Sequence, residues 1–303
     1  MKTLTIIMGD IRGGTPTWNS FKKHLIDPLQ SDLAIIYEDT PKIEQNILLN
    51  IAKFIWPVSY KNNWDEYFLK EYSENIVKNF LIGSKTSFAG GIKNNPGSGA
   101  RLFGFRDILY KNYLNIIQNY EQIILTRSDF FYIDNHPKLP NDSIWIPEGE
   151  DYGGIQDGLN IFPSKHSEKI LSICESLEKN KFNLIGMRTI SPETVLKEHY
   201  VNTSLIKIVK RYPRIQFSVA TKKDTTNWSK AHYNTFFMSS LRIKYPSQFI
   251  NIYKNNKKFS KKLINKINYK FIVFQLKVYK KISKILNYIN YHIKKRIHFM
   301  EHD

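Results

Sequence analysis

A short apolar stretch that ends abruptly in charge constrains the fold of this chain more than any other feature. Residues 123–125 (Ile-Ile-Leu) form the kind of run that makes a buried strand in a sheet covered on both faces. Residues 126–129 (Thr-Arg-Ser-Asp) follow at once and place a guanidinium and a carboxylate at the end of that strand. In open α/β sheets, ligands bind in the crevice outside the carboxyl ends of the strands. The pattern therefore predicts charged side chains at a cleft.

Two interpretations fit this charged strand end. Asp129 could hold a divalent metal through its hard oxygen atoms, while Arg127 could pair with phosphate oxygens. Alternatively, Arg127 and Asp129 form an ion pair that only closes the strand. The local pattern does not separate the two.

The start of the chain predicts a βαβ unit. Residues 3–8 are apolar enough for a central strand, and the glycine-rich loop 9–14 (Gly-Asp-Ile-Arg-Gly-Gly) follows. Glycines at this position let the backbone approach a ligand closely, although the GxGxxG spacing of dinucleotide-binding proteins is absent. A helix expected over 18–30 and a strand over 32–37 complete the unit, which predicts a parallel sheet.

Hydrophobic periodicity predicts the remaining elements. Helices are expected over 42–56, 64–82, 101–120, 164–180 and from Pro192 onwards, and strands over 143–147, 159–162 and 214–220, the last near a sheet edge. Residues 84–98 are rich in Gly, Ser and Asn and predict a long loop. Such a loop is either a functional lid or a disordered surface insertion.

An acidic stretch lies between two of these strands. Four carboxylates fall within ten residues, interleaved with glycines: Glu148, Glu150, Asp151 and Asp157. Neighbouring acids raise one another's pKa when they are buried, which suits a general base. Asp157 directly precedes the apolar run 159–162, so we expect it at the mouth of the core. Glu148 and Glu150 fit a solvated loop better.

Composition excludes several classes of protein. The 303 residues suffice for one large α/β domain or two small ones, and 42% hydrophobic residues argue against disorder. The single cysteine, Cys174, cannot form an internal disulfide and is expected in the core, which fits a reducing compartment. The first apolar run is too short for a signal peptide, and no stretch reaches the roughly 20 apolar residues of a membrane span.

The net charge of +18 is concentrated in a C-terminal tail. Residues 254–300 hold 14 Lys and Arg and no acid; Glu301 and Asp303 reduce the charge of the tail to +12, which leaves +6 for residues 1–253. Isoleucines and aromatic residues recur at helical spacing among these lysines, a pattern that favours a basic amphipathic helix on an anionic membrane. The alternative is a helix packed on its own domain. Nucleic acid is not expected as a partner, because no nucleic-acid-binding motif accompanies the charge.

In combination, these motifs resemble bacterial polysaccharide glycosyltransferases of the WavE lipopolysaccharide-synthesis type and related GT-A-like enzymes. The resemblance rests on the loop 9–14, the strand end 124–129, and Gly-Gly-Ile-Gln-Asp at 153–157, with Ser-Pro-Glu at 191–193 as a weaker fourth motif. It implies an α/β fold with a GT-A-like, Rossmann-like, mostly parallel sheet flanked by helices. The catalytic domain would span residues 1–253, and 254–303 would form the basic helical extension.

The resemblance also implies a site. A nucleotide-sugar, with a UDP-sugar as the expected donor, would bind at the carboxyl edge of the sheet, where an Asp-x-Asp motif holds a divalent metal. Here that motif reads Arg127-Ser128-Asp129, so either Asp129 ligates Mn or Mg, or Arg127 neutralises the diphosphate alone. The expected general base is Asp157, with Asp151 second. The expected donor-binding residues are Asp10, Arg12, Gly13, Arg101, Arg106, Arg127 and Glu193.

The implied reaction is sugar transfer to a hydroxyl of a growing capsule, lipopolysaccharide or lipooligosaccharide. A protein held peripherally on the inner, cytoplasmic face of the cytoplasmic membrane would meet a lipid-linked acceptor there. The alternatives are a membrane-associated binding or scaffold protein without catalysis, a nucleic-acid-binding protein that uses the tail, and a sugar-phosphate transferase.

Overall fold

The computed structural model describes most of the chain up to residue 252. The residues outside the description are 39–45, 61–62, 83–85, 189, 222, 225–234, 237–240, 246–247, 250–251 and 253–303. The basic tail predicted over 254–303 therefore lies outside the described residues. No helix among the described residues is long and apolar enough to cross a membrane.

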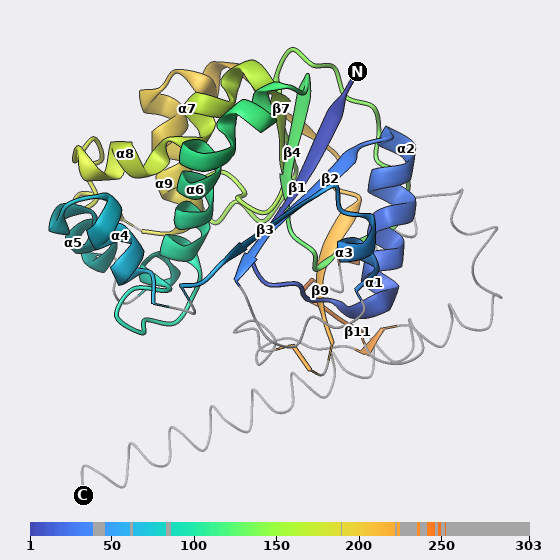
Figure 1. The fold of residues 1–303 in the computed structure, drawn as a ribbon, viewed down its shortest axis with the longest axis horizontal. Coiled ribbons are helices and arrows are strands. Elements are labelled where there is room, and N and C mark those ends of the chain that lie inside the picture. Colours follow the sequence, from blue (N-terminus) through green and yellow to red (C-terminus); the bar gives the residue numbers. More distant parts are fainter. Residues whose placement is uncertain are drawn as a thin grey trace, which may run out of the picture.

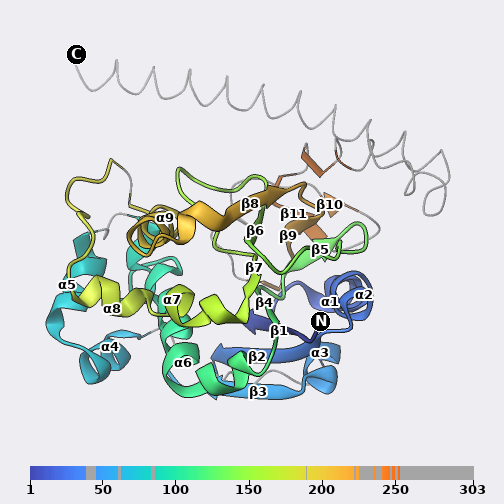
Figure 2. The same cartoon turned by 90° about the horizontal axis from the view of Figure 1, so that it is seen from above.

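A seven-stranded sheet forms the centre of the molecule, in the order β3-β2-β1-β4-β7-β6-β8 (Figures 1 and 2). The strands are β1 (Thr3–Met8), β2 (Asp32–Glu38), β3 (Phe54–Val58), β4 (Gln122–Thr126), β6 (Ile144–Pro147), β7 (Asn160–Pro163) and β8 (Val209–Tyr212). Strands β3, β2, β1 and β4 are parallel, as are β6 and β8, whereas β7 runs antiparallel to both of its neighbours. The predicted α/β class, with a mostly parallel central sheet, is confirmed.

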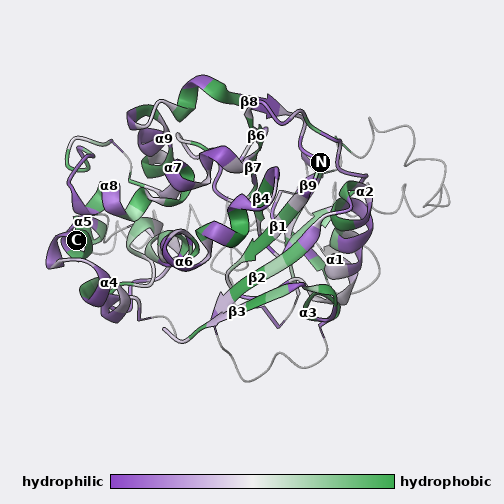
Figure 3. Ribbon diagram, turned by 45° about the horizontal axis from the view of Figure 1, so that its top comes forward, coloured by the Kyte–Doolittle hydropathy of each residue, from purple (hydrophilic) through white to green (hydrophobic). Residues whose placement is uncertain are grey.

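Helices cover both faces of this sheet, which explains its apolar strands. One face is covered by α1 (Gly14–Phe21), the π-helical turn Lys22–Ile26, α2 (Asp27–Leu29) and α3 (Ile47–Ile51). The other is covered by α4 (Asp65–Glu71), α5 (Glu74–Ile82), α6 (Gly99–Gln118), α7 (Ser167–Leu171), α8 (Ile173–Glu178) and α9 (Pro192–Asn202), with 3₁₀ turns Ser87–Ala89, Ser164–His166 and Leu205–Ile208. Successive β4 residues Ile123, Ile124 and Leu125 alternate between the two resulting cores. Figure 3 shows the apolar colouring along the central strands.

A second, four-stranded sheet in the order β10-β11-β9-β5 packs beside the first. It contains β5 (Phe130–Tyr132), β9 (Gln216–Ala220), β10 (Thr235–Phe236) and β11 (Leu241–Ile243). The strand expected over 214–220 was predicted near an edge, but β9 lies between β11 and β5 and is buried along its length. Because β5 begins directly after Asp129, the chain passes from the charged end of β4 straight into this second sheet.

The structure corrects three predicted helices. Within 42–56 only Ile47–Ile51 is helical, and Phe54–Val58 is the parallel edge strand β3. A short apolar run is compatible with the period of a helix and with that of a strand. The pairing of residues 54–58 with β2 makes this segment a strand. The segments 64–82 and 164–180 each form two helices, because the first breaks at 72–73 and the second at Ser172.

Candidate functional site

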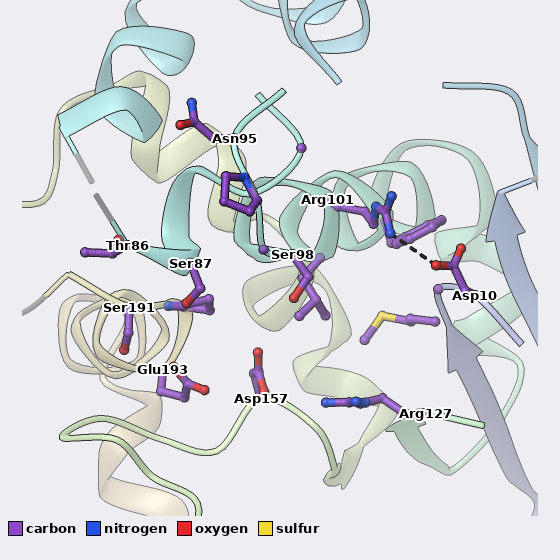
Figure 4. A pocket seen from close by; sticks show the side chains of 18 of the residues that line it. Asp10, Thr86, Ser87, Asn95, Ser98, Arg101, Arg127, Asp157, Ser191 and Glu193 are labelled. Atoms are coloured by element: carbon purple, nitrogen blue, oxygen red, sulfur yellow. Dashed lines mark hydrogen bonds and ion pairs between the residues drawn. The ribbon is translucent and has the colours of Figure 1, made fainter. Parts of the chain in front are cut away.

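A cavity of about 830 Å³ lies at the carboxyl ends of β1 and β4. The chain passes from β1 to β2 and β3 on one side, while β4 joins β1 on the other, so the cavity is at the point where the strand order reverses. Among the described residues, seven charged side chains line it: Asp10, Arg12, Arg101, Arg127, Asp157, Glu193 and Lys244. Figure 4 shows five of them projecting from separate segments toward one space.

Arg127 and Asp129 form a buried ion pair at the end of β4. Arg127 donates from Nε to Oδ1 at 2.9 Å and from Nη2 to Oδ2 at 2.7 Å, and Arg12 Nη2 lies 3.3 Å from Oδ2. Burial alone would raise the pKa of Asp129, but the charges of Arg127 and Arg12 hold it below its usual value. Both arginines line the cavity, whereas fully buried Asp129 lies behind them.

Hydrogen bonds hold the loops after β1 and β4 together. Ser128 Oγ accepts from the Arg12 amide at 2.9 Å and donates to the carbonyl of Asp10 at 3.1 Å. Gly13 has φ 95°, and a Cβ there would lie 3.2 Å from Asp129 Cα, so this close approach favours glycine. The Gly13 amide donates to Asp224 at 3.2 Å, and Gly13 does not line the cavity.

Arg101, in the first turn of α6, joins two acids at one side of the cavity. Its Nη1 lies 3.2 Å from Asp10 Oδ2, and its Nε lies 3.0 Å from Oε1 of Glu38 at the end of β2. Arg101 and Asp10 are therefore in the cavity as predicted, but each partly neutralises the other. Glu38 also accepts from Trp64 Nε1 at 2.8 Å, which fixes its orientation.

The acidic loop carrying Asp157 packs directly on the start of α9. Ser191 caps that helix through a capping box with Thr194. The Ile155 amide donates to the Glu193 carbonyl at 2.9 Å, and a Cβ on Gly154 would lie 1.9 Å from that oxygen. The missing Cβ of Gly154 thus lets the loop bring Asp157 to the same side of the cavity as Glu193 (Figure 4).

Asp157 and Glu193 form a carboxylate pair with raised pKa values. Burial, with the nearby charge of Asp157, raises the pKa of Glu193 to about 8. Burial also raises the pKa of Asp157, although Arg127, Arg106 and Lys244 oppose the shift. Such a pair holds one proton near neutral pH, so one carboxylate can act as a base while the other stays an acid.

The glycine-rich loop forms a wall of the cavity through close backbone packing. A Cβ on Gly90 would lie 2.0 Å from the Gly97 carbonyl carbon, and one on Gly99 would lie 2.4 Å from the Phe88 oxygen. Among the residues of this loop that line the cavity, five are polar and uncharged: Thr86, Ser87, Asn94, Asn95 and Ser98. Of the two interpretations of 84–98, the described part, 86–98, is packed against the domain rather than inserted loosely on its surface.

Besides Gly13 and Asp129, two further predicted residues do not line the cavity. Arg106 is fully buried inside α6, where its Nη2 donates to Asn160 Oδ1 at 3.3 Å. Asp151 pairs with Arg211 at 2.8 Å on the surface and also accepts from the Gln156 amide at 3.1 Å, so it shapes the loop. Neither residue lines the cavity.

Sequence reasoning missed Lys244 and misjudged Glu150. The Glu150 side chain is only 8% exposed and pairs with Arg214 and Lys244, so its predicted solvation is wrong. Lys244 and Tyr152 line the cavity near these residues. No local pattern marks Lys244, because the β11 strand that positions it is short and lies in the second sheet.

The residues at the end of β4 do not fit a metal bound to Asp129. Both of its oxygens accept from guanidinium groups, whose charge would repel a divalent cation. Across the described part of the chain there is no group of three or more His, Cys, Asp or Glu that could hold a metal ion. The arrangement instead presents arginines to the cavity.

Comparisons with known proteins add little to this geometry. No protein-family model matches the chain, and no curated protein matches it. Among solved structures, the chain is similar to the apo crystal structure of mouse xyloside xylosyltransferase 1, with 9% identity and a TM-score of 0.38 over 70% of this chain and 84% of that one. So low a TM-score carries no argument about what this chain does.

Proposed function

We propose that this protein is a glycosyltransferase that moves a sugar from a nucleotide-sugar donor to a hydroxyl group. The observation that carries the proposal is the cavity between the ends of β1 and β4, with arginines on one side and a carboxylate pair on the other. Its volume of about 830 Å³ suits a small-molecule ligand. Arginine forks match phosphate oxygens, and a carboxylate with a raised pKa suits proton transfer.

The proposed reaction uses Asp157 as the general base. Asp157 accepts the proton of the acceptor hydroxyl, whose oxygen forms a bond to the anomeric carbon. The bond from that carbon to the diphosphate oxygen breaks, and its electron pair leaves with the nucleoside diphosphate. Arg12 and Arg127 stabilise the charge on this leaving group. Asp157 then releases its proton to solvent.

Glu193 has a different role in this proposal. With a pKa of about 8 it is protonated near neutral pH, so it can donate a hydrogen bond to a sugar hydroxyl. The neutral wall of Ser87, Asn95 and Ser98 supplies further hydrogen-bonding groups for a sugar. This division explains why two adjacent carboxylates serve one site.

The proposal extends to the substrates and the place of action. We propose a UDP-sugar donor, a surface polysaccharide acceptor carried on a lipid, and peripheral attachment to an anionic membrane. The support is the resemblance of the sequence motifs and the 14 Lys and Arg without any acid over residues 254–300.

The test is a thermal-shift screen of the full chain against UDP-, GDP-, CMP- and TDP-sugars, followed by product analysis. A ligand at a hundred times its dissociation constant stabilises the folded state by about 2.7 kcal/mol, which is readily measured. We expect one nucleotide class to stabilise the protein and to be released as the nucleoside diphosphate. With a UDP-, GDP- or TDP-sugar, release of the nucleoside monophosphate would identify a sugar-phosphate transferase, whereas a CMP-sugar releases CMP in glycosyl transfer itself. No stabilisation by any nucleotide would favour a binding or scaffold protein.

A further inference from the structure

Two cavity-lining arginines are anchored on the same buried carboxylate oxygen. Arg127 Nη2 lies 2.7 Å and Arg12 Nη2 lies 3.3 Å from Asp129 Oδ2, so the two guanidiniums lie side by side. Asp129 itself is fully buried and does not line the cavity. The carboxylate therefore acts on the cavity only through the arginines that it holds.

The two guanidiniums keep donors for a further anion. Each guanidinium has five N–H groups in a planar fork. Arg127 donates to Asp129 from Nε and from one N–H of Nη2. Within the described residues, neither Arg127 Nη1 nor the buried Arg12 Nε donates a hydrogen bond. The unused Arg127 donors belong to a side chain that lines the cavity.

The local charge also favours an anion. Two positive guanidiniums surround one negative carboxylate, and the ammonium of Lys244, which pairs with Glu150 at 3.4 Å, lines the same cavity. The acid nearest to the β1 end of the cavity, Asp10, is paired with Arg101. An excess positive charge in a partly buried site attracts phosphate oxygens strongly.

We infer that Arg12 and Arg127 bind the diphosphate of the donor without a divalent metal, and that Asp129 is a positioning residue that orients both guanidiniums. This inference rests on the proposed function, since it concerns how the same cavity holds the same donor. It replaces the metal ligation expected of Asp129 with a charge-assisted arginine site.

The experiment measures nucleotide and metal binding separately on the full chain. Calorimetric titrations with UDP, GDP and TDP are run after treatment with EDTA, and again with added manganese. Binding of manganese alone is followed by electron paramagnetic resonance. We expect one nucleotide to bind with equal affinity in both conditions, and no stoichiometric manganese site.

Variants test the roles of the individual side chains. Arg127→Lys and Arg12→Lys keep the charge but lose the fork, so each should weaken nucleotide binding about tenfold to a hundredfold. Asp129→Asn should weaken binding similarly, with no rescue by manganese. Arg211→Lys is the matched control, because Arg211 also pairs with an aspartate but does not line the cavity. This variant should bind the nucleotide with unchanged affinity.

Two results would overturn the inference, and they differ in what else they reject. Nucleotide binding that requires manganese, with a manganese site lost in Asp129→Asn, would restore the metal and leave the proposed glycosyltransferase intact. Absence of nucleotide binding in both conditions would reject the inference together with the proposed function. If Asp129→Asn does not fold, Asp129→Glu and the two arginine variants provide the same comparison.

Discussion

Asp129 at the end of β4 and Glu193 at the start of α9 are both acids in poorly solvated surroundings, yet their pKa values shift in opposite directions. Asp129 is enclosed by two guanidiniums, so its pKa falls. Glu193 meets another carboxylate, so burial and repulsion raise its pKa to about 8. The contrast shows that the partner, and not burial alone, decides whether an acid anchors cations or carries a proton.

The largest expected effect comes from removing the proposed base. Asp157→Asn should lower the rate of sugar transfer about 100- to 10,000-fold, because the acceptor proton then has no carboxylate to receive it. Nucleotide affinity should change little. Steady-state kinetics with the donor found in the screen measures both. Asp151→Asn, outside the cavity, should lose far less activity; the reverse order of the two losses would identify Asp151 as the base.

The next largest effect should come from breaking the ion pair between Arg127 and Asp129. Arg127→Met leaves Asp129 buried with Arg12 alone and should destabilise the fold by about 3 kcal/mol in urea unfolding. Because the pKa of Asp129 is lowered, its stabilisation is present above about pH 4 and is lost as the pH falls further. The variant should therefore unfold at a higher pH on acidification. Lys22→Met breaks an exposed pair with Asp27 and should cost less than about 1 kcal/mol.

A smaller effect should follow from separating the two carboxylates. Gly154→Ala forces a Cβ against the Glu193 carbonyl, 1.9 Å away, and should destabilise the protein by about 1–3 kcal/mol. The shifted loop should move Asp157 away from Glu193 and lower the pKa of Glu193. Carbon-13 NMR titration of labelled glutamate follows that pKa. An unchanged pKa of Glu193 in a destabilised variant would show that the contact at Gly154 does not determine how close Asp157 lies to Glu193.

The last effect is a dependence of stability on pH. The pKa of Glu193 is about 8, so between about pH 4.5 and 8 only the folded state keeps its proton, and stability falls as the pH rises. The slope is at most about 1.4 kcal/mol per pH unit, shared with the charges of Asp157 and Lys244 that face the group. Glu193→Gln should flatten it in urea unfolding at several pH values. An equal slope in the variant would assign the effect to other groups.

Sequence reasoning located the central elements of the site because their signals are local. The apolar run 123–125 and the loop 9–14 predict the neighbouring strands β4 and β1, whose charged ends the sheet brings together. Asp10, Arg12, Arg101, Arg127, Asp157 and Glu193 all line the cavity. Arg106 was misplaced because α6 has buried residues on several sides, so helical spacing alone does not show which arginine reaches the cavity.

The features that the sequence did not predict depend on long-range packing. Strand β3 is selected by its pairing with β2, and Lys244 reaches the cavity only through the second sheet. The closeness of Asp157 and Glu193 depends on the backbone contact at Gly154, which no side-chain pattern encodes. The Arg127–Asp129 ion pair was one of the two interpretations of the strand end, but the same limit applies to the second partner, Arg12, which follows the neighbouring strand β1.

The glycine-packed loop 86–99 has a consequence for how the site can diverge. Its backbone segments are in close contact at Gly90, Gly97 and Gly99. Insertions or deletions there would therefore break this backbone packing. Asn95 and Ser98 both line the cavity, but Asn95 Nδ2 donates to the Ile92 carbonyl at 2.9 Å and helps to hold that backbone, so Ser98 is the residue of the two that can be exchanged with less effect on the loop. If the cavity binds a sugar as proposed, a new sugar preference would therefore be reached through point substitutions on a fixed wall, in contrast to the changes in length by which most surface loops evolve.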